Sequence, residues 1–135
     1  MSVTLEEAKA LAARVVEVAQ QGGLKIGVAI VNERAGTVLV HGMDGCRPFT
    51  PDTAHGKALG TVLWGMPGGR LEGKGGDSVF EFVNSQYGGR IVYAKGSALL
   101  VRDGLAHGAI GVSGGMPDID EEMAYAAAAD FAKGV

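Results

Sequence analysis

The sequence predicts an α/β fold of the α+β type, in which helices flank an antiparallel sheet of about five strands. Residues 4–21 carry apolar side chains at helical spacing. Short apolar runs separated by turn residues recur over 25–43 and 90–114, which is typical of strands. Residues 116–131 return to helical spacing. At 135 residues the chain is long enough to bury one core, so we expect a single domain over residues 1–135.

The first half is predicted to hold a helix, a strand pair and a second helix. Thr4 and Glu7 form a capping box for the first helix, which a glycine pair ends. The runs "KIGVAIVN" and "TVLVHGM" are expected to form a hairpin around "ERAG". In the second helix, "DTAHGKALGTVLWG", Ala54, Ala58 and Val62 share one stripe. Gly56 and Gly60 each weaken this helix by ~1 kcal/mol, so we expect another backbone to approach it closely.

The second half is predicted to hold a flexible loop, "LEGKGG", a short helix, "DSVFEFVNSQYGG", and three strands. The strands are "RIVYAKG", "SALLVRDG" and "LAHGAIGVSG", with Asp103-Gly104 as the turn between the last two. A closing helix begins near Met116-Pro117. Its apolar face is expected to comprise Ile119, Met123, Ala127 and Phe131. The acidic residues of its first turns, Asp118, Asp120, Glu121 and Glu122, are expected to complement the helix dipole.

The composition excludes several classes of function. The formal net charge is −3 and no basic cluster is present, which argues against nucleic acid as a partner. No apolar run approaches the ~20 residues of a membrane span, and the N-terminus is acidic where a signal peptide would be basic. A single cysteine, Cys46, fits a reducing compartment. We therefore expect a cytoplasmic protein without a membrane partner.

Apolar residues make up 47% of the chain and charged residues only 20%. Some of this apolar surface is expected to be covered by other copies of the chain, so the sequence predicts a homo-oligomer.

The stretch Ser113-Gly114-Gly115 joins the last strand to the last helix and allows two interpretations. Successive amides in a glycine-rich turn at a helix start form an anion-binding concavity. Alternatively, the glycines only make a tight corner. The flanking glycines lack the G-x-G-x-x-G spacing of a dinucleotide site, and Pro51 stands where a phosphate loop around Lys57 would need glycine.

His55 and Lys57 are the main candidates for chemistry on the second helix. His55 follows a loop that holds Asp44 and Arg47, and a lone histidine of this kind is either a structural residue or a ligand or acid/base group. Lys57 is either a lysine lying over the edge of the core or a partly buried ammonium that meets an anionic ligand. Cys46 is interpreted as an ordinary loop thiol. No histidine spacing in the chain predicts a zinc site.

Three segments resemble the GlcG/HbpS family of small haem-binding and haem-degrading-type proteins. They are "MDG" at 43–45, "AHGKALGT" at 54–61 and "GAIGVSGGMPDIDEEMA" at 108–124. The same module forms the C-terminal domain of the corrinoid adenosyltransferase PduO. The similarity runs from "TLEEAKALA" to the closing helix. Gly60 and the glycine-rich segment 68–89 depart from the family's pattern.

The resemblance implies a profilin-like three-layer α/β/α fold, assembled as a dimer or larger oligomer, with a pocket near a subunit contact. The residues that it places around a small anionic ligand are Asp44, Arg47, Lys57, Ser113, Gly114 and Gly115, with His55 as a haem-iron ligand.

Three hypotheses for the function follow from these residues and the resemblance. In the first, haem or another carboxylate-bearing ligand is bound, with its carboxylates against Gly114, Gly115 and Lys57 and any haem iron held by His55 or by a nearby hydroxyl or thiol. In the second, the protein is a cofactor-independent catabolic enzyme, an isomerase, hydratase or hydrolase, in which Lys57 holds a small organic acid and His55 shuttles a proton. In the third, it is an accessory subunit for assembly. The resemblance favours the first, while an aromatic content of only 6% argues for a small or shallow site and keeps the second open.

Overall fold

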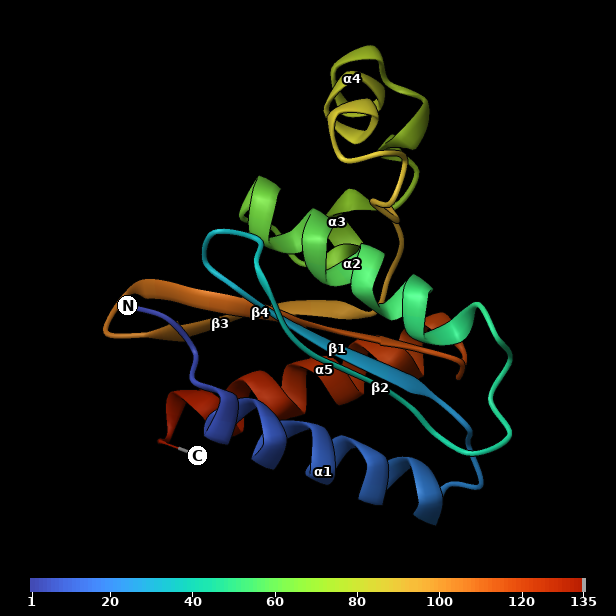
Figure 1. The fold of residues 1–135 in the computed structure, drawn as a ribbon, viewed down its shortest axis with the longest axis vertical. Coiled ribbons are helices and arrows are strands. Elements are labelled where there is room, and N and C mark those ends of the chain that lie inside the picture. Colours follow the sequence, from blue (N-terminus) through green and yellow to red (C-terminus); the bar gives the residue numbers. More distant parts are fainter. Residues whose placement is uncertain (135) are drawn as a thin grey trace.

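The computed structural model describes residues 1–134 and contains a four-stranded antiparallel sheet between two layers of helices (Figure 1). The strands are β1 (Gly27–Asn32), β2 (Thr37–Gly42), β3 (Ser97–Arg102) and β4 (Leu105–Ser113), in the order β2-β1-β4-β3. The helices are α1 (Leu5–Gln21), α2 (Thr50–Trp64), α3 (Gly68–Leu71), α4 (Ser78–Gln86) and α5 (Pro117–Ala132), with a 3₁₀ turn η1 (Lys74–Gly76). Helices α1 and α5 cover one face of the sheet and α2 covers the other. The predicted three-layer fold is confirmed.

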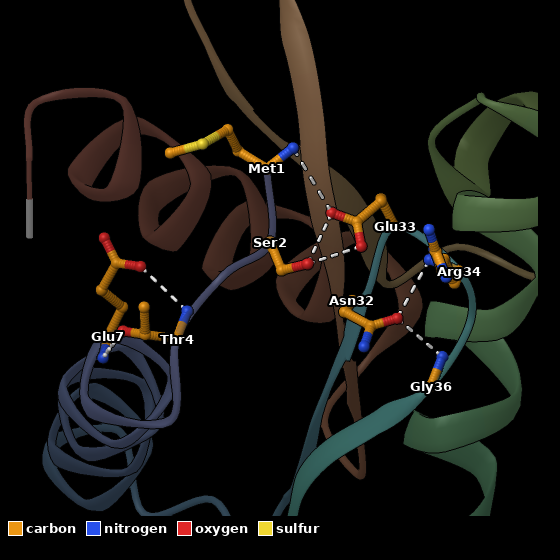
Figure 2. A network of polar contacts seen from close by, with 8 residues as sticks. All are labelled: Met1, Ser2, Thr4, Glu7, Asn32, Glu33, Arg34 and Gly36. Atoms are coloured by element: carbon orange, nitrogen blue, oxygen red, sulfur yellow. Dashed lines mark hydrogen bonds and ion pairs between the residues drawn. The ribbon is translucent and has the colours of Figure 1, made fainter.

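The capping box predicted for α1 is present (Figure 2). The amide of Glu7 donates to Thr4 Oγ1 at 3.1 Å, and the amide of Thr4 donates to Glu7 Oε1 at 2.9 Å. Nearby, the Ser2 hydroxyl donates to Glu33 in the turn between β1 and β2, and Asn32 Oδ1 accepts from two amides of the same turn. The start of the chain is thereby attached to the first hairpin.

Both predicted hairpins are confirmed. Strands β1 and β2 pair through "ERAG", and β3 and β4 pair through Asp103-Gly104. Both residues of the second turn have positive φ, 53° and 76°, which is the geometry that a tight two-residue turn between twisted strands requires.

The sheet has four strands and not the five expected, because residues 90–96 do not join it. The backbone of this segment finds its partners elsewhere: Asn84 bonds both the amide and the carbonyl of Ile91, and the Val92 amide donates to the Gly56 carbonyl of α2 at 3.1 Å. A Cβ at Gly56 would overlap the Arg90 carbonyl oxygen. The close backbone expected at the glycines of α2 is therefore this segment, which lies over the helix.

The two faces of the sheet are packed differently. On the α1 and α5 side, large side chains such as Leu11, Ile30, Ile110 and Phe131 form the main core. On the α2 side the strands carry small residues, and a Cβ at Gly111 would overlap the Ala54 carbonyl oxygen of α2. Close contact of this kind fixes the position of α2, and with it His55 and Lys57, relative to β4.

The buried face of α5 differs from the predicted one at its first position. Met123, Ala127 and Phe131 are buried as expected. Ile119, however, is 39% exposed, whereas Asp120 beside it is only 2% exposed. The helix therefore turns a carboxylate, and not an isoleucine, toward the interior at its N-terminal end.

The short helix α4 lies away from the sheet (Figure 1) and has no buried residue. An aromatic group attaches it to the end of α2: the Phe80 ring stacks on Trp64 at 4.0 Å, and Tyr93 contacts Phe80 edge-on at 5.4 Å. The predicted helix is confirmed, while part of the "LEGKGG" loop forms η1. Within residues 1–134, no helix is both long and apolar enough to cross a bilayer.

Candidate functional site

A cavity of about 510 Å³ lies where the β4–α5 junction meets the loop after α1 and the loop before α2. Of the residues predicted for the site, the structure brings five together in the lining of this cavity: Arg47, Lys57, Ser113, Gly114 and Gly115. Lys25, Cys46, Phe49 and Asp120 also line it. We call it the Lys57 cavity.

The junction is a tight corner as well as part of the cavity lining. Gly114 has a φ of 110°, and a Cβ on it would approach the Lys25 carbonyl oxygen to 2.7 Å. A residue with a side chain would be strained there and would also push the loop after α1 away. Chain geometry alone thus requires this glycine, and the same bare backbone leaves the cavity wall open.

Asp120 lies beneath the junction and accepts from two groups that we expected to meet an external anion. Its Oδ1 accepts from the Gly115 amide at 2.9 Å, and its Oδ2 lies 3.5 Å from Lys57 Nζ. Lys57 Nζ also donates to the Val112 carbonyl oxygen at 3.0 Å. Lys57 and Asp120 are 5% and 2% exposed, respectively. The floor of the cavity is therefore a buried ion pair within the chain.

Burial acts on both members of this pair in the direction of the neutral forms. Desolvation lowers the pKa of Lys57, against the attraction of Asp120, and desolvation raises the pKa of Asp120, against the attraction of Lys57 and the Gly115 hydrogen bond. The free energy needed to move a proton from the ammonium to the carboxylate is thus smaller here than between the same two groups in water.

The charges around the cavity do not cancel. Lys25 and Arg47 are exposed cations at its rim, while Lys57 is matched by Asp120 at its floor. The lining carries Lys25, Arg47 and Lys57 against Asp120, its single acidic residue. This excess of positive charge favours a ligand that carries carboxylate groups.

His55 lies in a different cavity, about 440 Å³ in volume, on another side of α2. It lines this cavity with Asp52, Arg90 and four other residues: Phe49, Thr53, Gly89 and Val92. Residues two apart in an α-helix point in nearly opposite directions, which is why His55 and Lys57 separate. Phe49 is common to both cavities.

The surroundings of His55 favour the neutral imidazole. Its Nε2 lies 2.9 Å from Thr37 Oγ1 on β2. Burial lowers the pKa of His55, the nearby Arg90 charge lowers it further, and Asp52 opposes both. A neutral ring keeps a nitrogen lone pair available for a proton or a metal ion.

Asp44 lines a third cavity, of about 460 Å³, together with His41 and Lys25. The loop at Gly23–Lys25 separates this cavity from the Lys57 cavity and contributes to both. Asp44 is therefore a neighbour of the Lys57 cavity and not part of its lining. Among the residues that the structure describes, no group of three or more His, Cys, Asp or Glu is placed to hold a metal ion.

Sequence reasoning missed Asp120 and Lys25 as site residues. Asp120 had a signal, since it stands three and seven residues before Met123 and Ala127, on the same buried stripe of α5. Lys25 had none, because only the folded position of the loop after α1 brings it to the cavity.

Comparison with known proteins places this geometry in a family. A model of the family described as HbpS-like, "Haem degrading protein HbpS-like", matches residues 3–129. The chain belongs to the HbpS-like family. Its match covers the whole sheet and most of α5, and so includes all three cavities. The predicted resemblance is thereby confirmed.

Solved structures share the fold of this HbpS-like chain over nearly its whole length. A double mutant of HbpS from Streptomyces reticuli is 28% identical, with a TM-score of 0.82 over 96% of this chain and 87% of that one. ORFY from Klebsiella pneumoniae is 22% identical, with a TM-score of 0.84 over 98% of this chain and 92% of that one. The protein chain of a PduOC:haem complex is 24% identical, with a TM-score of 0.82 over 96% of this chain and 94% of that one. No protein in a curated collection matches this chain significantly.

Proposed function

We propose that this HbpS-like chain binds haem, or another flat ligand with carboxylate groups, in the Lys57 cavity. The observation that carries the proposal is the excess of positive charge around a cavity of about 510 Å³, a volume typical of small-molecule sites. The family's description as haem-degrading and the haem complex of the PduOC relative support haem as the ligand.

The residues present fit the carboxylates and the ring plane of haem. Lys25 and Arg47 at the rim are the groups to hold the carboxylates, because Lys57 and the Gly115 amide already have Asp120 as partner. Phe49 at the rim is 62% exposed and offers an apolar surface to the ring. A guanidinium binds carboxylate in a two-point geometry, so Arg47 is the stronger anchor.

Two residues are candidates for the iron ligand. Cys46 lines the Lys57 cavity itself, and a thiolate is an established haem ligand. His55, the ligand expected from the sequence, lines the neighbouring cavity, which shares Phe49 with the Lys57 cavity, so it is a candidate only for a haem that extends past Phe49. Bound haem would supply redox-active iron, and the ligand that holds it would tune its potential.

The test is a haem titration monitored by the Soret band, with four single variants. We expect Arg47→Ala to weaken binding by about tenfold, which corresponds to ~1.4 kcal/mol for a charge-assisted contact. Cys46→Ser should change the Soret position if the thiolate is the ligand, and His55→Ala should do so if the imidazole is. Binding that is absent, or that is unaffected by Arg47→Ala and Lys25→Ala, would exclude the Lys57 cavity as the haem site.

The enzyme alternative gains support from Asp120. In the sequence-based hypothesis, Lys57 holds the organic acid and His55 moves the proton, yet these residues line separate cavities. Asp120 is the proton acceptor that lies within the Lys57 cavity, and burial shifts the pKa values of Asp120 and Lys57 toward each other. Turnover of a small organic acid that Asp120→Asn abolishes and His55→Gln preserves would establish this alternative.

We also propose that the protein is a homo-oligomer with the Lys57 cavity near a subunit contact. Phe49, which lines the Lys57 cavity, and Met116, which directly follows the junction, are 62% and 66% exposed, and apolar side chains of this size favour coverage by a second copy. Light scattering during gel filtration measures the mass directly. A monomer at all concentrations would contradict the proposal.

A further inference from the structure

Lys57 has a position that haem binding does not explain. Its side chain lies at the floor of the cavity, 6% exposed, while the carboxylates of a bound ligand are better held by the exposed cations at the rim. A buried ion pair contributes little net stability, because removing both charges from water offsets their attraction. Neither ligand affinity nor stability therefore accounts for a buried ammonium and carboxylate at the floor of an open cavity.

The geometry suits a nucleophilic amine. Lys57 Nζ has a carboxylate oxygen at 3.5 Å to take its proton and the Val112 carbonyl oxygen at 3.0 Å to orient it. The Gly96 backbone packs against the end of the side chain, since a Cβ there would lie 2.7 Å from Nζ. The amine is thus held in one position beside its base, and burial favours its neutral, nucleophilic form.

We propose that Lys57 forms a reversible imine with a carbonyl-bearing ligand of the Lys57 cavity, and that Asp120 transfers the protons. The ligand class is a small 2-oxo acid, in which the carbonyl and the carboxylate are adjacent: the carbonyl carbon would lie at Lys57, and the positive charge of Arg47 and Lys25 would attract the carboxylate into the cavity. The inference uses the cavity of the proposed function but does not depend on haem.

The reaction balances within the pair. Asp120 takes a proton from the ammonium, and the Nζ lone pair attacks the carbonyl carbon while the π electrons move to the oxygen. Asp120 returns its proton to that oxygen, takes one from the nitrogen, and then protonates the hydroxyl, which leaves as water. An amine and a ketone give an imine and water, and no oxidant or reductant is consumed.

Reductive trapping tests the inference on the wild-type protein without haem. The protein is incubated with pyruvate and cyanoborohydride, which converts an imine to a stable secondary amine, and the modified lysine is located by peptide mass spectrometry. We expect most of the adduct on Lys57, although it is far less exposed than Lys9, Lys74 or Lys133. Acetone, which lacks the carboxylate, should modify Lys57 much less.

Two variants make the result specific to the site. Lys57→Met combined with Asp120→Asn removes both charges together and should lose the adduct while retaining the fold by circular dichroism. Lys9→Met removes an exposed lysine outside the cavity and should retain the adduct on Lys57. An adduct confined to exposed lysines, or one of equal yield with acetone, would overturn the inference. Loss of haem binding with trapping intact would defeat only the proposed function.

Discussion

His55 and Lys57 stand two residues apart on α2 but belong to different environments. Lys57 is buried and paired with Asp120. His55 is half-buried, bonded to Thr37 and close to the charge of Arg90. Gly56 between them lies beneath the segment that carries Arg90 and Val92. Adjacency in the sequence of a helix is therefore a poor guide to a shared site, because a step of two residues reverses the direction of the side chain.

Charge is stabilised differently in the two environments. Around Lys57, a carboxylate of the same chain compensates the buried ammonium. Around His55, burial and the nearest cation act together against a charged ring. In the first environment two charges compensate each other, whereas in the second burial and Arg90 favour the neutral form of the ring. Changing either environment should leave the other largely intact, and this separation is open to experiment.

The largest effect should come from removing one member of the buried pair. Lys57→Met leaves Asp120 buried without its cation, and we expect a loss of about 3–5 kcal/mol in the free energy of unfolding. Lys57→Met with Asp120→Asn should recover most of this loss, since a neutral pair has no charge to solvate. Urea denaturation of the wild type and the two variants measures both values. If the double variant were as unstable as the single one, the ion pair would itself contribute net stability to the fold, beyond the mutual compensation of its two charges.

A smaller effect, on the His55 side, is expected from Gly56→Ala. The added Cβ would meet the Arg90 carbonyl oxygen and approach the Val92 amide nitrogen to 3.1 Å. We expect a net loss of about 1–3 kcal/mol from this overpacking, despite the gain in helix propensity. Hydrogen exchange of the Val92 amide should become faster.

Gly76→Ala is the matched control, because a Cβ at Gly76 meets no atom within 4 Å. Trapping on Lys57 should persist in Gly56→Ala, since the perturbed segment lines the cavity of His55 and not that of Lys57. Equal stability of the two alanine variants would contradict the close packing of residues 90–92 on α2.

Most of the fold was predictable because its signals are local. The capping box at Thr4, the Asp103-Gly104 turn and the spacing of Met123 and Phe131 each act within a few residues. The number of strands was not predictable, because "RIVYAKG" has the composition of a strand, whereas its backbone bonds to Asn84 and to Gly56 of α2 and not to the sheet. Tertiary contacts prevail over local propensity in such a segment.

The candidate site was predictable in part for the same reason. Lys57 and the Ser113-Gly114-Gly115 corner do line one cavity, and the wall they form was anticipated from backbone chemistry. The role of Asp120, which already binds the Gly115 amide and Lys57, was not predictable. The first turns of α5 hold four acidic residues, and they look equivalent in the sequence. The structure separates them: the exposed Asp118 pairs with Lys95, Glu121 accepts from the amides of Gly96 and Ser97, and Asp120 is buried.

The smallest expected effect is the dependence of stability on the protonation of His55. Because its pKa in the folded chain lies below the value of 6.5 for a free side chain, the unfolded chain takes up the proton first as the pH falls. The contribution of His55 to stability is thus present above about pH 6.5 and is lost on acidification.

His55→Gln should therefore lose less stability than the wild type between about pH 7 and about pH 5. His41→Gln, at an exposed position of β2, is the control and should follow the wild type. Nuclear magnetic resonance of the imidazole resonances gives the pKa of His55 directly, and a value at or above 6.5 would show that its cavity does not exclude charge.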